Sequence, residues 1–162
     1  MDRRIRGGGV DPSIPRQSGA MAKRKYFTID EANRTLPLVQ RIVQDIVDEY
    51  RGWKECLARY ELAAAYQRPE EGESPDAVAL RRRVDEIAQQ INDYIAELEQ
   101  IGCVLKGFDD GLVDFRCKFG RRDVWLCWKL GETEVAHWHE LDAGYRSRQP
   151  IAPELAGDSS DR

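Results

Sequence analysis

Residues 36–65, LPLVQRIVQDIVDEYRGWKECLARYELAAA, decide the fold class, because their apolar side chains recur at alternating steps of three and four residues. The series is Leu36, Val39, Val43, Ile46, Tyr50, Trp53, Leu57, Tyr60 and Ala64. Such a spacing, kept over many turns, places the side chains along one stripe of a helix, as in coiled coils. The stretch therefore predicts a long helix with one apolar seam.

The start of this helix is marked by a capping box. Glu31 follows Thr28 at the spacing at which the two side chains satisfy backbone N–H groups of the first turn. Pro37 lies inside the pattern, where a proline removes a backbone donor and crowds the preceding turn, so we expect a kink or a short first segment there. Residues 68–74, RPEEGES, then interrupt the seam.

A second seam follows this interruption. Ser74 and Pro75 suit the N-cap and first position of a helix, and Gly102 suits its end. The apolar residues between them are Leu80, Val84, Ile87, Ile91, Tyr94, Leu98 and Ile101. Two seams joined by a short loop predict an antiparallel, coiled-coil-like helical hairpin over residues 28–102. Because so thin an arm leaves apolar surface exposed, we expect a protein partner or a homodimer through it.

Beyond Gly102 the period of the pattern changes to two. Short segments rich in β-branched and aromatic residues predict three or four antiparallel strands in a meander over residues 103–142. These segments are CVLKGF (103–108), GLVDFRCKF (111–119), DVWLCWKL (123–130) and EVAHWHEL (134–141). One face of such a sheet needs cover, which the helical hairpin can supply. The chain is predicted to be one α+β domain over residues 25–151, with disordered ends at 1–24 and 152–162.

The composition argues against several classes of protein. A chain of 162 residues suffices for one domain of ordinary size. Its net charge of −4 lacks the basic footprint of a nucleic-acid-binding protein, so we expect no nucleic-acid partner. No apolar run approaches the roughly 20 residues of a membrane span. The four cysteines lack C-x-x-C spacing and no secretory signal is recognisable, which favours a cytoplasmic location.

Residues 125–149 concentrate the side chains suited to chemistry. If a three-residue turn closes the last hairpin, the candidate ligands of a zinc or iron ion share one face of the sheet: Cys127, His137 and His139. Glu132 or Asp114 would lie nearby. A two-residue turn would shift the register and remove Cys127 from that face. The simpler interpretation is an aromatic hairpin that binds no cofactor, with one histidine exposed and the other hydrogen-bonded.

Three segments resemble those of a known family. YFTIDEANRTLPLV (26–39), GLVDF (111–115) and LCWKLGETEVAHWHELDAGYRSRQPI (126–151) are similar to domain of unknown function 2203, a group of small prokaryotic proteins. The resemblance covers residues 26–151 and implies no reaction. It identifies as motif positions Asp114, Cys127, Trp128, Gly131, Glu132, Trp138, His139, Gly144 and Arg148. Ser147 stands where the family pattern has a glycine.

Two functions are consistent with these patterns. The favoured one is a cytoplasmic, non-enzymatic scaffold or adaptor whose helical arm contacts a protein. Its sheet would present a functional surface of Asp114, Trp128, Glu132, Trp138, His139 and Arg148. The alternative is a metal- or small-ligand-binding protein, with enzymatic activity left open, that uses Cys127, His137, His139 and Glu132. A change in the seam, such as Ile46 or Ile87 to Asp, would abolish the first function, and a change of His139 the second.

Overall fold

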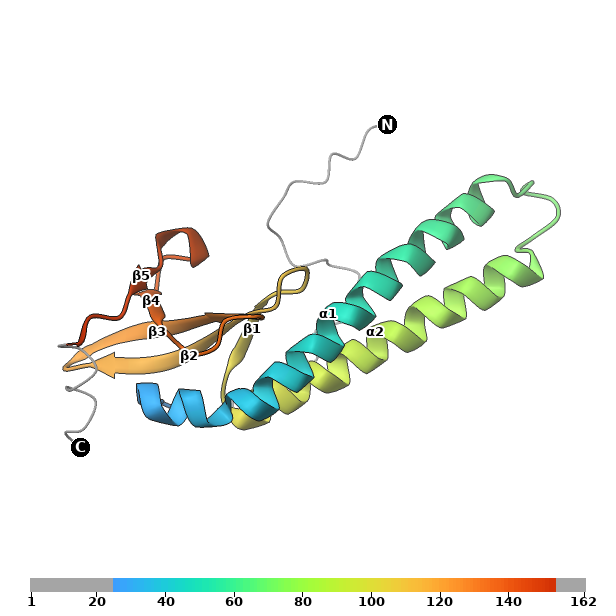
Figure 1. Ribbon diagram of the computed structural model, residues 1–162. Helices are drawn as coiled ribbons and strands as arrows, with labels where there is room; N and C mark the ends of the chain where they lie inside the picture. Colours follow the sequence, from blue (N-terminus) through green and yellow to red (C-terminus); the bar gives the residue numbers. More distant parts are fainter. Residues whose placement is uncertain (1–24, 154–162) are drawn as a thin grey trace.

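The structure is a computed structural model that describes residues 25–153, in which two long helices precede a five-stranded sheet (Figure 1). The helices are α1 (Ile29–Ala65) and α2 (Pro75–Ile101). The strands are β1 (Val104–Gly107), β2 (Leu112–Phe119), β3 (Arg122–Lys129), β4 (His137–Glu140) and β5 (Gln149–Pro150), with a 3-10 turn, η1 (Tyr145–Ser147), before β5. The α+β class is confirmed. The expected disordered end 1–24 and residues 154–162 of the expected tail lie outside the described residues.

Both helices begin, and α2 ends, at residues that the sequence marks, while α1 ends at Ala65, shortly before the interruption at 68–74. Thr28 Oγ1 accepts a hydrogen bond from the backbone N–H of Glu31 at 3.1 Å. Ser74 Oγ accepts one from the N–H of Ala77 at 3.2 Å. Gly102 ends α2 with φ of 108°, a left-handed conformation that glycine adopts without steric cost.

Pro37 bends α1 without ending it. The helix is continuous from Ile29 to Ala65, and Figure 1 shows its first turns running in a different direction from the remainder. A proline inside a helix lacks the N–H of the helical ladder and its ring crowds the turn before it, which produces a bend of this kind. Of the two expected outcomes, the kink is the one present.

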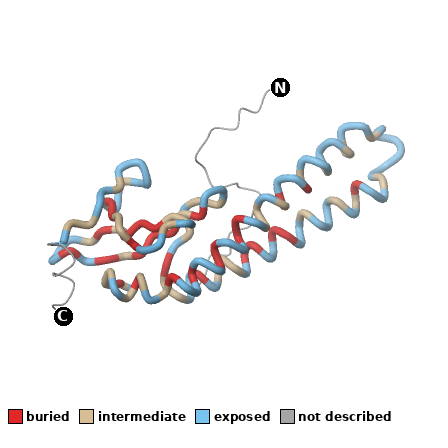
Figure 2. The backbone as a smooth tube through the Cα atoms, viewed as in Figure 1, coloured by how far each residue is buried: buried red, intermediate tan, exposed pale blue. Residues whose placement is uncertain are grey.

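The helical hairpin is buried mainly at the end that carries the sheet (Figure 2). The buried residues of α1 are Ala32, Leu36, Val39, Ile42, Val43, Ile46, Val47, Trp53 and Cys56. Beyond Cys56 no side chain of α1 is buried, and Leu62 and Tyr66 are 60% and 83% exposed. The far half of the hairpin is thus a thin arm. Within residues 25–153, no helix is long and apolar enough to cross a membrane.

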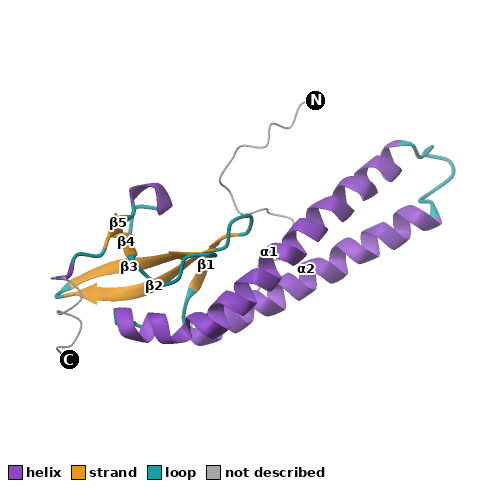
Figure 3. Cartoon of the chain, viewed as in Figure 1, coloured by secondary structure: helices purple, strands orange, loops and turns teal. Residues whose placement is uncertain are grey.

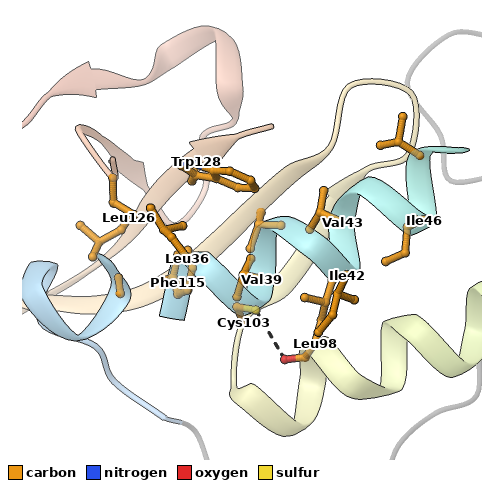
Figure 4. Close-up of a cluster of buried hydrophobic side chains, with 14 of the residues drawn as sticks. Leu36, Val39, Ile42, Val43, Ile46, Leu98, Cys103, Phe115, Leu126 and Trp128 are labelled. Carbon is orange, nitrogen blue, oxygen red and sulfur yellow. Dashed lines mark hydrogen bonds between the residues drawn. The ribbon is translucent and has the colours of Figure 1, made fainter. Parts of the chain in front are cut away.

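The sheet (Figure 3) is an antiparallel meander in the order β1-β2-β3-β4-β5, one strand more than the largest number predicted. The additional strand, β5, has two residues and contains a proline, so it leaves no strand pattern in the sequence. One face of the sheet packs on the helices, where Leu36, Val39 and Val43 of α1 meet β2 and β3 (Figure 4). The side chains they meet include Phe115, Leu126 and Trp128.

The register of β3 on β4 is the one predicted from a three-residue turn. The pairs include Cys127 with His137 and Trp125 with His139. The strands nevertheless stop short of that turn, so residues 130–136 form a longer loop. The N–H of Val135 in this loop donates to Asn33 Oδ1 of α1 at 2.8 Å, which ties the loop to the helix.

Candidate metal centre

The sheet face turned away from the helices carries a cluster of three buried polar side chains. Because successive residues of a strand point to opposite faces, Asp114 in β2 points away from the core that Val113 and Phe115 enter. Asp114 pairs with Cys127 of β3 across a two-residue turn, and His139 of β4 lies one strand further. Three adjacent strands therefore each contribute one side chain.

The cluster is tight. One ligand atom from each of Asp114, Cys127 and His139 lies within 4.8 Å of the other two. His139 Nε2 is 3.1 Å from Asp114 Oδ2, and His139 Nδ1 is 2.8 Å from the backbone carbonyl of Glu140. Since a carbonyl only accepts, Nδ1 carries a proton and Nε2 faces the cluster. Histidines that bind metals through Nε2 are commonly oriented by such a bond from Nδ1.

Burial controls the protonation of the cluster. Asp114, Cys127 and His139 are 3%, 2% and 3% exposed. Burial raises the pKa of Asp114, against the lowering effect of His139. Burial, together with the nearby charge of Asp114, raises the pKa of Cys127 to about 12. The thiol is therefore protonated at neutral pH. This environment disfavours the thiolate, which is the nucleophilic form of cysteine.

The order of the hydrogen bonds also argues against a catalytic relay. In a Cys–His–Asp relay the imidazole lies between the other two groups and uses one nitrogen for each. Here Nδ1 of His139 binds the Glu140 carbonyl, so only Nε2 remains for Asp114 and Cys127 together. The three side chains can each offer one ligand atom to a point between them, a geometry that suits a metal ion.

A pocket of about 250 Å³ opens above the cluster. It is lined by Lys106, Leu112, Asp114, Trp125, Cys127, His139, Leu141, Ala143, Gly144 and Tyr145. Segment 141–145, which follows β4, contributes four of these residues and forms one side of the pocket. The cluster is thus buried in the chain but adjoins a space of small-molecule size.

A second polar cluster fixes the chain around this pocket. Glu132 Oε1 accepts hydrogen bonds from the backbone N–H of Lys129 at 2.7 Å and from Arg148 Nη1 at 2.8 Å. His137 Nδ1 is 3.5 Å from Glu132 Oε2 and makes no hydrogen bond within the described chain. The ion pair of Glu132 with Arg148 joins the loop after β3 to the segment that leads into β5.

The sequence-predicted site residues fall into three places. Cys127 and His139 lie together, and the third member of their cluster is Asp114, whereas His137 lies beside Glu132. Arg148 belongs with Glu132 in the second cluster. Trp128 and Trp138 lie on the opposite, helix-facing side of the sheet and belong to the hydrophobic core.

The residues that form the walls of the pocket were not predicted from the sequence. The pairing of Asp114 with Cys127 follows from a two-residue turn at Gly120 and Arg121, a signal present in the sequence. The position of Tyr145 has no comparable signal, because segment 141–148 is irregular and has no period.

The fold and the cluster define a class: an α+β protein in which a helical arm supports a five-stranded sheet with a buried Asp–Cys–His group. The model of the domain of unknown function 2203 family, described as "Uncharacterized conserved protein", matches residues 25–151. The chain therefore belongs to this family, as its sequence resemblance predicts. Comparisons with curated proteins and with solved structures give no significant match.

Proposed function

We propose that this protein binds one transition-metal ion, zinc or iron, through Asp114, Cys127 and His139. The observation that carries the proposal is the burial of three different metal-ligating groups with their ligand atoms within 4.8 Å of one another. Buried ionisable groups are costly unless they are paired or coordinate a metal. Asp114 interacts with both His139 and Cys127, and a metal would bind all three side chains in place of these contacts.

The donor set selects the kind of ion. Tetrahedral zinc with bonds of about 2.0–2.3 Å needs ligand atoms roughly 3.3–3.7 Å apart. The 3.1 Å between His139 Nε2 and Asp114 Oδ2 is close to this spacing, and a modest inward shift of Cys127 would complete the set. A thiol and an imidazole suit zinc or ferrous iron, while magnesium and calcium take oxygen ligands.

The surroundings support the same chemistry. The bond from His139 Nδ1 to the Glu140 carbonyl holds the ring with Nε2 toward the site. The Arg148 guanidinium lies near the Cys127 sulfur, where it acts against burial to lower the pKa of the thiol. A cation at this position stabilises the thiolate that a metal requires.

The test is metal content in matched pairs of variants. Untagged protein purified without chelator is analysed for bound metal, with Asp114→Asn, Cys127→Ser and His139→Gln as site variants. Each has a control with the same substitution outside the cluster: Asp123→Asn, Cys117→Ser and His137→Gln. We expect about one metal ion per chain in the wild type and the controls, and loss in the site variants. A wild type without metal after incubation with zinc, or site variants that retain it, would overturn the proposal.

The scaffold or adaptor role is a second candidate, favoured by the end of the helical arm. A shallow depression there is lined by Arg59, Leu62, Ala63, Tyr66, Asp76, Ala79 and Leu80. Leu62 and Tyr66 are among the most exposed large apolar residues described. Apolar surface of this kind is typical of protein contacts, including self-association.

Light scattering tests the homodimer form of this second candidate. At micromolar concentration we expect the mass of a dimer, reduced to that of a monomer by Leu62→Asp. The control is Leu38→Asp, a similarly exposed leucine outside the depression. A monomeric wild type would contradict self-association through the arm.

The cytoplasmic location stays part of the proposal, supported by four free and buried cysteines.

A further inference from the structure

We infer that the proposed metal ion keeps one coordination position open to the pocket and binds there a small carboxylate, whose second oxygen contacts Lys106. The inference rests on the proposed metal site and adds a ligand class to it. It draws on three features of the described chain: the number of protein ligands, the charge of the pocket and its size.

Only three protein ligands are at hand, and they approach from one side. Asp114, Cys127 and His139 all project from the same face of the sheet. Within residues 25–153 the cluster contains no fourth histidine, cysteine or acidic ligand. Zinc sites with three protein ligands leave the fourth position to water or substrate, whereas structural sites close it with a fourth residue. The fourth position here faces the pocket that the same three side chains line.

The charge of the loaded pocket favours an anion. Metal binding requires the deprotonated forms of Asp114 and Cys127, whose two negative charges balance a divalent ion. Lys106 then adds a positive charge to the pocket: its charge lowers the pKa of Asp114, and no carboxylate of the described chain lies within ion-pair distance of its Nζ. Its ammonium lies 5.2 Å from the centre of the Trp125 ring, at the pocket wall. A single negative charge would neutralise the site.

The size and the walls restrict the anion to a short chain. A volume of about 250 Å³ is below the usual range of drug-sized ligand pockets. Leu112, Leu141 and the Trp125 ring provide apolar surface. A carboxylate with a short aliphatic chain fits these features: one oxygen on the metal, the other on Lys106, and the chain against the apolar walls.

When cobalt(II) replaces the native metal, both metal binding and carboxylate binding can be followed in the absorption spectrum. A tetrahedral cobalt–thiolate site absorbs visible light, and a change of its fourth ligand alters the bands. Cobalt-loaded protein is titrated with butyrate, and with butyramide as the uncharged control of equal size. We expect saturable spectral changes with butyrate and none with butyramide. A cobalt spectrum unaffected by butyrate would overturn this inference alone, while failure to bind cobalt or zinc would overturn the proposed function as well.

Variants of two lysines distinguish a specific contact of Lys106 with the carboxylate from a general effect of positive charge on butyrate binding. Lys106→Met should still bind cobalt when the metal is saturating, and it should weaken butyrate about tenfold or more, since a charge-assisted bond is lost. Lys118→Met is the matched control, because Lys118 also lies over an aromatic ring, that of Tyr26, and neither of these two residues lines the pocket. Equal affinity in both variants would exclude Lys106 as the carboxylate contact. An acetylated dipeptide with a free C-terminal carboxylate distinguishes the source of the group: if only the dipeptide binds, the ligand is a chain terminus and the small-carboxylate inference is wrong.

Discussion

His139 Nε2 lies 3.1 Å from Asp114 Oδ2 in a pair whose side chains are 3% and 4% exposed. Because Nδ1 already donates to the Glu140 carbonyl, the contact is made in one of two ways. Either a protonated imidazole donates to the carboxylate, or the carboxylic acid donates to a neutral imidazole. In both cases the pair holds one proton and carries no net charge, which suits its buried position.

Metal binding should therefore depend steeply on pH. The metal must displace protons from Asp114, whose pKa burial raises, and from Cys127, whose pKa burial raises to about 12. Protons compete with the metal, so its affinity rises with pH, by about two logarithmic units per pH unit where both protons are released. Zinc titrations against a competing chelator between about pH 6 and pH 8 measure this slope. A slope near zero would show that these groups are not ligands.

The half of the helical hairpin that carries the sheet should contribute most of the free energy of unfolding. Ile91 of α2 is fully buried, so Ile91→Ala should lower the free energy of unfolding by about 2–5 kcal/mol. Leu62→Ala, at a side chain 60% exposed in the single chain, should change it by no more than about 0.5 kcal/mol at concentrations where the protein is monomeric. Urea denaturation followed by circular dichroism compares the two. Equal effects would mean that the arm is packed along its whole length.

Gly111 joins β1 and β2 at a point where no other residue fits. Its φ is 69°, and a Cβ there would lie 2.7 Å from Val43 Cγ1 and 2.8 Å from Leu130 Cβ. We expect Gly111→Ala to cost about 2 kcal/mol or more, from backbone strain and overpacking together. Gly52, in α1 with nothing within 4 Å of its added Cβ, is the opposite case. Gly52→Ala should stabilise the protein by about 0.5–1 kcal/mol in the same denaturation assay.

The helices could be predicted because the apolar seams that define α1 and α2 are periodic. The register of β3 on β4 could be predicted only as one of two alternatives, because it depended on the length of the turn, and the alternative with Cys127 opposite His137 is the one present. The surroundings of the candidate site depend on tertiary contacts that leave no periodic pattern in the sequence. The two histidines share one face, yet His139 is buried against Asp114 while His137 stays 28% exposed beside Glu132. His139 lies in the pocket that the irregular segment after β4 helps to line, and this segment leaves no pattern in the sequence.

The ion pair between Glu132 and Arg148 should hold this irregular segment in place. Arg148→Met removes the partner of a carboxylate that is largely buried, so residues 141–151 should exchange their amide hydrogens faster. Global unfolding should change less than local opening, because the core lies on the other face of the sheet. Arg146→Met, at an exposed arginine in η1, is the control. Unchanged exchange in Arg148→Met would show that other contacts hold the segment.

X-ray absorption spectroscopy of the zinc-loaded protein tests the central claim most directly, because it counts the ligand types around the ion. The account predicts one sulfur at about 2.3 Å and nitrogen or oxygen ligands at about 2.0–2.2 Å, with the sulfur lost in Cys127→Ser but kept in Cys117→Ser. A shell with no sulfur, or with two or more, would contradict a site made of Asp114, Cys127 and His139.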